Sequence, residues 1–240
     1  MPSHALNVLQ NDLVQDDSIY HEDGFVPDYI HTCMVETVVV VRHGQRLDKL
    51  DKEWAFTSAA PWDSPLSDKG MRDVDHLADE IGGLGFPRPV ALYCSPFLRC
   101  VQTAAPIAKK LGIKMRICCG LGEWMTPEYF DLGAPPSDNH NTIAATSKLY
   151  LTRYDPISVD YMWPLEFCGP AGIYGETWTD MHERAEKCLN HLEQTCEKTI
   201  IIVSHGSLCN GMISILRRIS QMEIIEEGHY VMIPHRGRGS

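Results

Sequence analysis

Four consecutive valines, Val38 to Val41, run directly into Arg42-His43-Gly44. A short unbroken run of β-branched residues is typical of a strand buried on both faces, as in a parallel sheet covered by helices. Further strands are predicted at residues 90–94, 113–117 and 200–203. Helical patterns alternate with them at residues 68–81, 98–110, 177–197 and 207–219. This alternation predicts an α/β fold, a three-layer α-β-α sandwich with a mostly parallel central sheet.

Two local signals refine the helices. Asp68 is the expected N-cap of the first helix, because its carboxylate can accept from free backbone N–H groups. Pro106 lies inside the second helix and is expected to kink it or to delay its regular portion, because proline lacks the N–H that a helix interior needs.

The 240 residues suit one large domain. Residues 1–34 are polar and acidic without periodicity and predict a loosely ordered leader, with the folded domain at 35–240. Two segments, about 48–65 and 124–175, are rich in proline and aromatic residues and interrupt the alternation. Long loops of this kind in a compact domain are typical of active-site insertions.

Charge and composition exclude several classes of protein. The formal net charge of −11 argues against binding to nucleic acid or to an anionic membrane. No apolar run approaches the length of a membrane span, and no signal sequence is present at the N-terminus. The nine cysteines contain no Cys-x-x-Cys pair, which indicates reduced thiols, a cytoplasmic location and no structural zinc.

Polar clusters follow each predicted strand at its carboxyl end. They are Arg42-His43-Gly44, residues 95–99 with Arg99, Gly122-Glu123, and Ser204-His205-Gly206. Because the carboxyl ends of parallel strands meet at one edge of a sheet, these side chains are expected to converge. Two arginines, two histidines and a carboxylate in one place predict a phosphate pocket with a nucleophile attached.

Each residue type suits one part of phosphoryl transfer. The imidazole of His43 is nucleophilic near neutral pH and can form a phosphoramidate. The planar guanidinium groups of Arg42 and Arg99 bind phosphoryl oxygens, and His205 can donate to another. Glu123 can protonate the leaving oxygen and then accept a proton from the attacking water. None of these steps requires a metal or a cofactor.

The order and spacing of these motifs over residues 36–218 resemble the histidine phosphatase superfamily, the phosphoglycerate-mutase-like clan. The resemblance rests on Arg42-His43-Gly44, Ser95-Pro96-x-x-Arg99-x-x-Gln102-Thr103-Ala104, Gly175-Glu176-Thr177 and Ser204-His205-Gly206. Arg46 and the Gly120-x-Gly122-Glu123-Trp124 run resemble a narrower group. That group contains the suppressors of T-cell receptor signalling, which are protein tyrosine phosphatases, the ecdysteroid-phosphate phosphatases and a yeast transcription-factor subunit.

The resemblance implies a role for each matching residue. His43 would be the phosphohistidine nucleophile, and Arg42, Arg99 and His205 would complete the phosphate pocket, with Arg46 as a further basic contact. Glu123 matches the acid of the narrower group, and Gly175-Glu176-Thr177 would support the pocket from behind. The resemblance also implies a metal-independent enzyme without a cofactor that acts on a phosphorylated small molecule or a phosphoprotein. It leaves a homodimer open.

The chain departs from the family pattern at two places. Asp73 stands where glutamine is usual, which predicts a packing difference. The chain ends soon after Pro234, where relatives typically continue with another strand, which predicts a thinner sheet edge.

Three functions are weighed. The favoured one is a phosphomonoesterase acting through phosphohistidine on a bulky substrate such as phosphotyrosine, because the insertion at 124–175 is long. A phosphoglycerate mutase or sugar-bisphosphate phosphatase would need basic residues for a second phosphate. A non-catalytic scaffold with a phosphatase fold is disfavoured because the core residues are all present.

Overall fold

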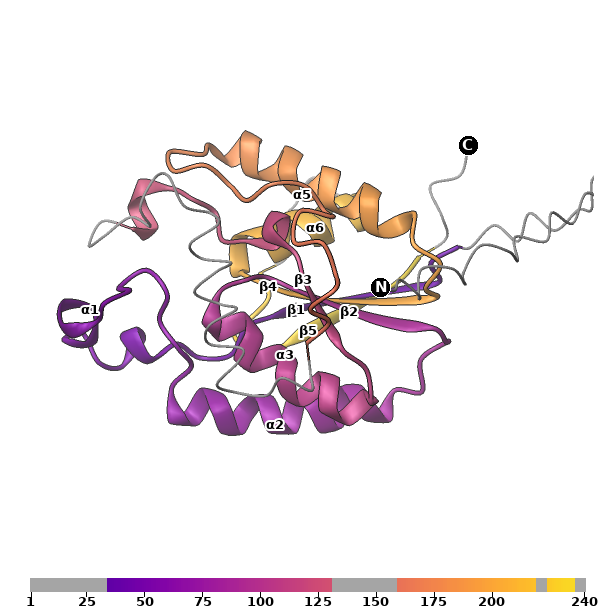
Figure 1. Ribbon diagram of the computed structural model, residues 1–240, viewed down its shortest axis with the longest axis horizontal. Coiled ribbons are helices and arrows are strands. Elements are labelled where there is room, and N and C mark those ends of the chain that lie inside the picture. The colour runs from indigo at the N-terminus through magenta and orange to yellow at the C-terminus, as the bar shows by residue number, and fades with distance from the viewer. Residues whose placement is uncertain (1–33, 131–158, 219–223, 236–240) are drawn as a thin grey trace, which may run out of the picture. The chain divides into compact units, whose positions relative to one another are not determined.

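A computed structural model of the chain describes residues 34–130, 159–218 and 224–235 (Figure 1). The strands are β1 (Thr37–Arg42), β2 (Val90–Cys94), β3 (Met115–Ile117), β4 (Thr199–Ser204) and β5 (Tyr230–Pro234). The α-helices are α1 (Trp54–Thr57), α2 (Asp68–Gly83), α3 (Leu98–Leu111), α5 (Trp178–Glu193) and α6 (Gly206–Arg217). Short 3-10 turns are η1 (Leu47–Lys49), η2 (Cys119–Leu121) and η3 (Pro127–Tyr129). The predicted leader and the middle of the second insertion lie outside the described residues.

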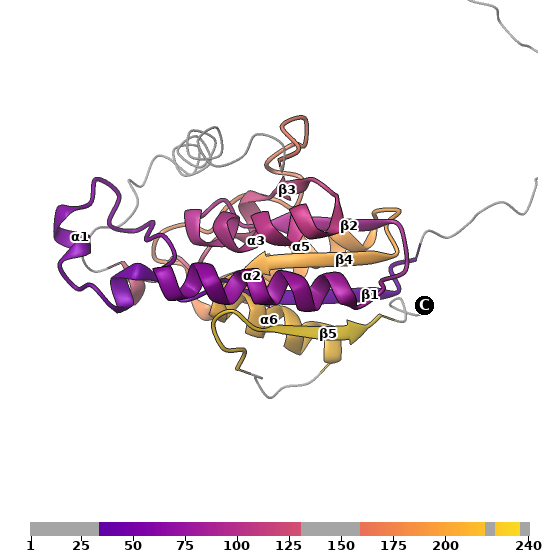
Figure 2. The same cartoon turned by 90° about the horizontal axis from the view of Figure 1, so that it is seen from below.

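The five strands form one sheet in the order β3-β2-β4-β1-β5, which Figure 2 shows from one face. Strand β4 lies in the middle and pairs in parallel with β1 and β2, and β3 pairs in parallel with β2. Helices α2 and α3 pack together on one face, and α5 and α6 pack together on the other (Figure 1). The predicted three-layer α/β sandwich with a mostly parallel sheet is therefore confirmed.

The valine run of β1 shows why this sequence forms a central strand. Val38 and Val40 contact the core beneath α5 and α6, whereas Val39 and Val41 contact the core beneath α2 and α3. Successive side chains of a strand point to opposite faces, so two apolar layers require four apolar residues in a row. Burial of each valine contributes roughly 1.5–3 kcal/mol to the free energy of unfolding.

Strand β5 was not predicted from the sequence. It pairs antiparallel with β1 and forms the edge of the sheet next to the strand that carries the Arg-His-Gly motif. Its side chains are mostly half-buried or exposed, so the segment lacks the continuous apolar pattern of a central strand. The expectation of a thinner sheet edge stays a prediction, and among the described residues Tyr230 to Pro234 form the edge strand.

The observed boundaries of two helices and one strand correct three sequence predictions. The N-cap of α2 is Ser67 rather than Asp68, and the Ser67 hydroxyl accepts from the N–H of Gly70 at 3.0 Å. Strand β3 begins at Met115 rather than at residue 113, because Gly112 ends α3 in a left-handed conformation and the N–H of Ile113 donates to the Ala108 carbonyl. Helix α5 ends at Glu193, four residues before the predicted end.

Helices α3 and α5 carry local features that matter at the site. Helix α3 continues across Pro106 from Leu98 to Leu111. Helix α5 begins with a capping box, in which Thr177 and Asp180 satisfy each other's backbone N–H groups. Within the described ranges, the helices are too short and too polar to cross a bilayer.

Candidate active site

His43 follows the last residue of β1 and is 2 % exposed. Its backbone N–H donates to the Ser204 carbonyl at 3.0 Å, so the sheet fixes where the side chain begins. The Nδ1 atom lies 2.8 Å from the carbonyl oxygen of Gly44. A carbonyl can only accept, so Nδ1 carries the proton and Nε2 keeps its lone pair. Burial, together with Arg99 and His205, holds the pKa of His43 well below its usual value. The ring is therefore neutral and nucleophilic at neutral pH.

The turn after His43 requires glycine and is tied to α3. A Cβ atom on Gly44 would lie 2.8 Å from Cγ1 of Val74 and 3.2 Å from the carbonyl oxygen of Gly70. The N–H of Gly44 donates to Oγ1 of Thr103, and that hydroxyl donates to the carbonyl of Arg99. Thr103 therefore fixes the nucleophile loop relative to the arginine on the neighbouring helix.

Arg99 lies in the first turn of α3 and is only 1 % exposed. Its Nη2 atom lies 3.1 Å from Oε2 of Glu123 and 3.1 Å from Nδ1 of His205. The guanidinium group also lies 4.6 Å from the ring centre of Phe97, and Nη1 lies 3.9 Å from Oδ1 of Asp63. Its Nε and Nη1 atoms are buried without a hydrogen-bond partner among the described residues.

Arg42 ends β1 on the other side of the nucleophile. Its Nη1 atom donates to the Ile225 carbonyl at 2.9 Å, and Nη2 lies 3.6 Å from Glu227. A Cβ atom on Gly206 would lie 3.0 Å from Cζ of Arg42, so the glycine lets α6 begin against the guanidinium. Within the part of the chain that the structure describes, its Nε atom is also buried without a partner.

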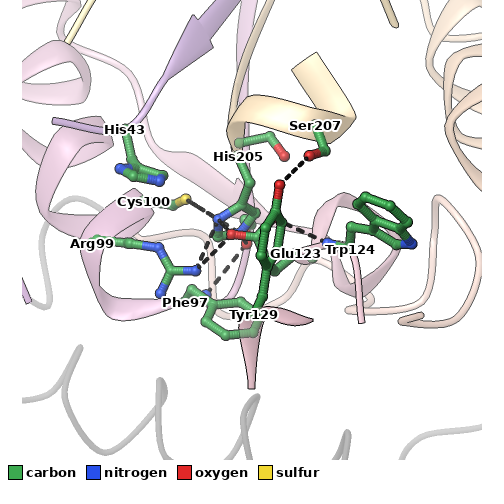
Figure 3. Close-up of polar contacts among 12 residues, drawn as sticks. His43, Phe97, Arg99, Cys100, Glu123, Trp124, Tyr129, His205 and Ser207 are labelled. Atoms are coloured by element: carbon green, nitrogen blue, oxygen red, sulfur yellow. Dashed lines mark hydrogen bonds and ion pairs between the residues drawn. The ribbon is translucent and has the colours of Figure 1, made fainter. Parts of the chain in front are cut away.

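His205 follows β4 and is the N-cap of α6, with its side chain fully buried. Figure 3 shows its ring between Arg99, Cys100 and Glu123. Its Nε2 atom lies 2.8 Å from Oγ of Ser95, and Nδ1 lies 3.1 Å from Oε2 of Glu123. Burial lowers the pKa of His205 to about 4, although Glu123 opposes this and Arg99 adds to it. The ring centres of His43 and His205 are 5.5 Å apart.

Glu123 follows η2 and is buried. Burial alone would raise the pKa of Glu123, but His205, Arg99 and His43 together hold it well below the usual value. Its second oxygen accepts from the N–H of Trp124 at 3.1 Å. Glu123 is therefore ionised in the free protein, and its proton affinity rises when a negative group is placed beside it.

A buried ion pair supports the Glu123 loop from behind. Arg184 in α5 donates from Nε and Nη2 to the two carboxylate oxygens of Glu176, at 2.7 and 2.8 Å. The same guanidinium donates to the carbonyls of Gly120, Gly122 and Glu123. Glu176, the middle residue of the Gly175-Glu176-Thr177 run, therefore supports the Glu123 loop through Arg184.

Arg46 is paired differently from the other two arginines. Its Nε and Nη2 atoms donate to the two carboxylate oxygens of Asp48, at 2.9 and 2.5 Å. It lines the pocket, but its charge is compensated by this neighbour. Its phosphate contact stays a prediction.

Of these side chains, Arg42, His43, Arg46 and Glu123 line a pocket of about 300 Å³, whereas the buried Arg99 and His205 are not among its lining residues. Its lining consists of Arg42, His43, Arg46, Asp48, Lys49, Glu123, Glu128, Tyr129, Gly206, Ser207 and Glu227. At its mouth the Tyr129 hydroxyl lies 3.2 Å from Oγ of Ser207, and the Tyr129 ring packs edge-on against Trp124 (Figure 3). Phe130, by contrast, is buried with Phe97 and Met125. A larger cavity of about 580 Å³ lies between residues 168–176 and α5 and shares no lining residue with this pocket.

The pocket suits an anion better than a cation. One nitrogen or oxygen from each of His43, Glu123 and His205 lies within 4.8 Å of the others, which is a spacing that a metal ion could use. The Arg99 guanidinium, however, lies 3.1 Å from the Glu123 and His205 atoms of that set. A fixed positive charge at this distance opposes a metal cation and favours an oxyanion.

Sequence reasoning missed Asp63, Thr103 and Arg184. Asp63 is buried, accepts from the N–H of Leu98 at 2.8 Å and lies beside Arg99, and burial raises its pKa to about 6 despite that arginine. Thr103 lay within a quoted motif, but its link to Gly44 needs tertiary structure. Arg184 lies in an amphipathic helix, where an arginine is ordinarily exposed.

Stability is expected to fall as the pH is lowered from 6.5 towards 4. The folded state keeps His205 neutral until about pH 4, whereas the unfolded chain protonates it near pH 6.5, so the unfolded state binds more protons in this window. The loss is about 1.4 kcal/mol per pH unit for each such histidine. Asp63 acts in the opposite direction below about pH 6, because its raised pKa favours protonation of the folded state.

The free energy of unfolding, measured with denaturant at several pH values for the wild type and for His205→Asn, checks the predicted loss of stability. The variant should lose less free energy of unfolding per pH unit than the wild type. Equal slopes for the two proteins would contradict the assignment of the effect to His205.

Comparison with known proteins agrees with the geometry. The family model described as "Histidine phosphatase superfamily (branch 1)" matches residues 38–229. The 55 kDa subunit of transcription factor tau from Saccharomyces cerevisiae is 35% identical over 97 residues, covering 40% of this chain and 22% of that protein. The human ubiquitin-associated and SH3 domain-containing protein A is 27% identical over 212 residues, covering 73% of this chain and 30% of that protein. The chain therefore matches less than a third of the length of either relative.

Solved structures share the fold at low identity. The ecdysone phosphate phosphatase of the silkworm Bombyx mori, in complex with tungstate, superposes with a TM-score of 0.53 at 18% identity. That match covers 80% of this chain and 81% of the other. The alpha-ribazole phosphatase of Shigella flexneri gives a TM-score of 0.52 at 17% identity, covering 82% and 89%. The family model spans both histidine motifs together with Arg42 and Arg99, and the chain belongs to the histidine phosphatase superfamily, branch 1.

Proposed function

We propose that the chain is a phosphomonoester hydrolase in which His43 carries the phosphoryl group. One observation carries the proposal. Around a neutral histidine with a free Nε2 lone pair, the half-buried Arg42 and the buried Arg99 hold three buried nitrogens that no described residue satisfies: Nε of Arg42 and Nε and Nη1 of Arg99. A buried guanidinium nitrogen without a partner is costly, and the oxygens of a phosphoryl group supply the missing acceptors.

The proposed first step transfers the phosphoryl group to the protein. Nε2 of His43 attacks phosphorus, the bond from phosphorus to the ester oxygen breaks, and the leaving oxygen takes a proton from Glu123. The Nδ1–H bond to the Gly44 carbonyl holds the ring in the reactive tautomer. The dianionic phosphate brings negative charge beside Glu123 and raises its pKa, so Glu123, which is ionised in the free protein, takes up a proton from solvent as the substrate binds and can then donate it.

The proposed second step returns the enzyme to its first state. Glu123, now ionised, accepts a proton from water as the water oxygen attacks phosphorus. The bond from phosphorus to Nε2 breaks, inorganic phosphate leaves, and Glu123 releases its proton to solvent. Arg42 and Arg99 stabilise the negative charge of the transferring group in both steps.

A bulky or aromatic leaving group, such as a phosphotyrosine side chain, is the substrate class we favour. Tyr129 is 49% exposed, lines the pocket and is held by Trp124 and Ser207, so its ring is available to an aromatic group. Ring pairs of this kind contribute about 0.5–1.5 kcal/mol beyond burial. Among the similar structures, one is an ecdysone phosphate phosphatase, whose name also specifies a large leaving group.

A direct assay with para-nitrophenyl phosphate and phosphotyrosine peptides tests the proposal. We expect hydrolysis of both by the wild type, and a Tyr129→Ala variant that loses about tenfold in kcat/KM on the aromatic substrates. On a small alkyl phosphate the same variant should change little. Failure of the wild type to hydrolyse any phosphate monoester from pH 5 to 8 would overturn the proposed function.

A further inference from the structure

The charges around the pocket affect how well a charged leaving group binds. The positive side chains are Arg42, Arg46, Lys49 and the buried Arg99, and the carboxylates are Asp48, Glu123, Glu128 and Glu227. Asp63 lies beside Arg99 and adds a fifth carboxylate to these four cations, so a bound phosphate dianion leaves the site with an excess of negative charge. The chain as a whole carries a net charge of −11, which adds to the same field.

Most of the positive side chains either lie where the phosphoryl group would bind or are already paired with a carboxylate. Arg42 and Arg99 lie beside His43, where the phosphoryl group binds, and Arg46 is held in a two-point ion pair by Asp48. Lys49, at the end of η1, is the pocket cation that no described carboxylate pairs. Among the described residues of the pocket, a second anionic group would therefore have one unpaired lysine to contact.

Two of the carboxylates, Glu128 and Glu227, are less fully paired with cations. Glu128 lies in η3, is exposed, adjoins Tyr129 at the mouth and is paired with no cation within the described ranges. Glu227 lies 3.6 Å from Nη2 of Arg42, a cation that a bound phosphate would neutralise. Both carboxylates line the pocket into which the leaving group would extend if phosphorus is at His43.

We propose that Glu128 and Glu227 make the pocket select phosphate monoesters whose leaving group is neutral or positively charged. This inference rests on the proposed function and specifies its substrate class. It disfavours bisphosphorylated sugars and strongly acidic phosphopeptides, and it favours a monophosphate with neutral or basic surroundings. Long-range repulsion of this kind weakens as salt is added, because the screening length falls to about 8 Å at physiological ionic strength.

The test uses phenyl phosphates of matched size with a para-aminoethyl, para-hydroxyethyl or para-carboxyethyl group. The two-carbon spacer keeps the reactivity of the three leaving phenols similar. At low salt we expect kcat/KM to fall in that order, by about tenfold between the cationic and the anionic substrate, and the ratio to shrink in high salt.

Three variants locate the effect. Glu128→Gln should reduce the ratio of the cationic to the anionic substrate by about threefold, and Lys49→Gln should increase it. Glu80→Gln is the matched control, because Glu80 is exposed near the far end of α2 and does not line the pocket. It should leave the ratio unchanged.

The outcomes separate the two proposals. Hydrolysis of all three substrates at equal kcat/KM, or a Glu128→Gln variant with the wild-type ratio, would overturn the charge selectivity and leave the phosphatase assignment intact. If none of the three substrates is hydrolysed, the proposed function itself fails.

Discussion

Replacing His43 with asparagine is expected to lower kcat for phosphomonoester hydrolysis by about 10⁵-fold, because the variant has no nitrogen lone pair to attack phosphorus. Asparagine is chosen because its amide can still donate to the Gly44 carbonyl, as Nδ1 of His43 does. Since Arg42, Arg99 and His205 are untouched, the dissociation constant for inorganic phosphate should change by less than about tenfold.

Steady-state kinetics and phosphate titration measure these two quantities. His76→Asn is the matched control, because His76 is exposed on α2 and does not line the pocket, and it should keep wild-type kinetics. A His43→Asn protein with more than about a hundredth of wild-type kcat would contradict the role of His43 as nucleophile.

Replacing Arg99 with lysine is expected to lower kcat/KM by about 10³-fold although the positive charge is kept. A lysine has one nitrogen at its tip, whereas Arg99 contacts Glu123 and His205 through Nη2 and still has Nε and Nη1 for an oxyanion. The variant should also bind inorganic phosphate about tenfold or more weakly.

Arg116→Lys is the control for this substitution. Arg116 pairs with Glu197 and stacks on Trp163 at the β3 edge, outside the lining of the pocket. Its exchange should change kcat/KM by less than about threefold. If Arg99→Lys retained kcat/KM within about tenfold of the wild type, the planar fork of Arg99 would not be the feature that holds the phosphoryl group.

The fold could be predicted from the sequence where both faces of an element are buried. Strands β1, β2 and β4 have nearly continuous apolar runs, and their flanking helices have clear 3.6-residue periodicity, so the parallel core follows from pattern alone. Strand β5 could not be predicted, because an edge strand is partly exposed and its partner β1 lies far away in the sequence.

The candidate site, like the fold, could be predicted from the sequence only in part. The convergence of His43, Arg99, Glu123 and His205 follows from the rule that parallel strands end at one edge, and the structure brings these side chains together. The pairing of Arg46 with Asp48, and the support of the Glu123 loop by Arg184, depend on side-chain directions that the sequence does not specify. Those contacts decide which charges remain available to a ligand.

Detection of the covalent intermediate tests the central claim most directly. The wild type is mixed rapidly with a phosphate-labelled aryl phosphate, quenched in alkali, digested and mapped by mass spectrometry. A phosphoramidate is stable in alkali and labile in acid, so the label should appear on the peptide that contains His43, disappear in mild acid and be absent from His43→Asn. Label on another residue, or full turnover with no label on His43 at any time, would contradict the account.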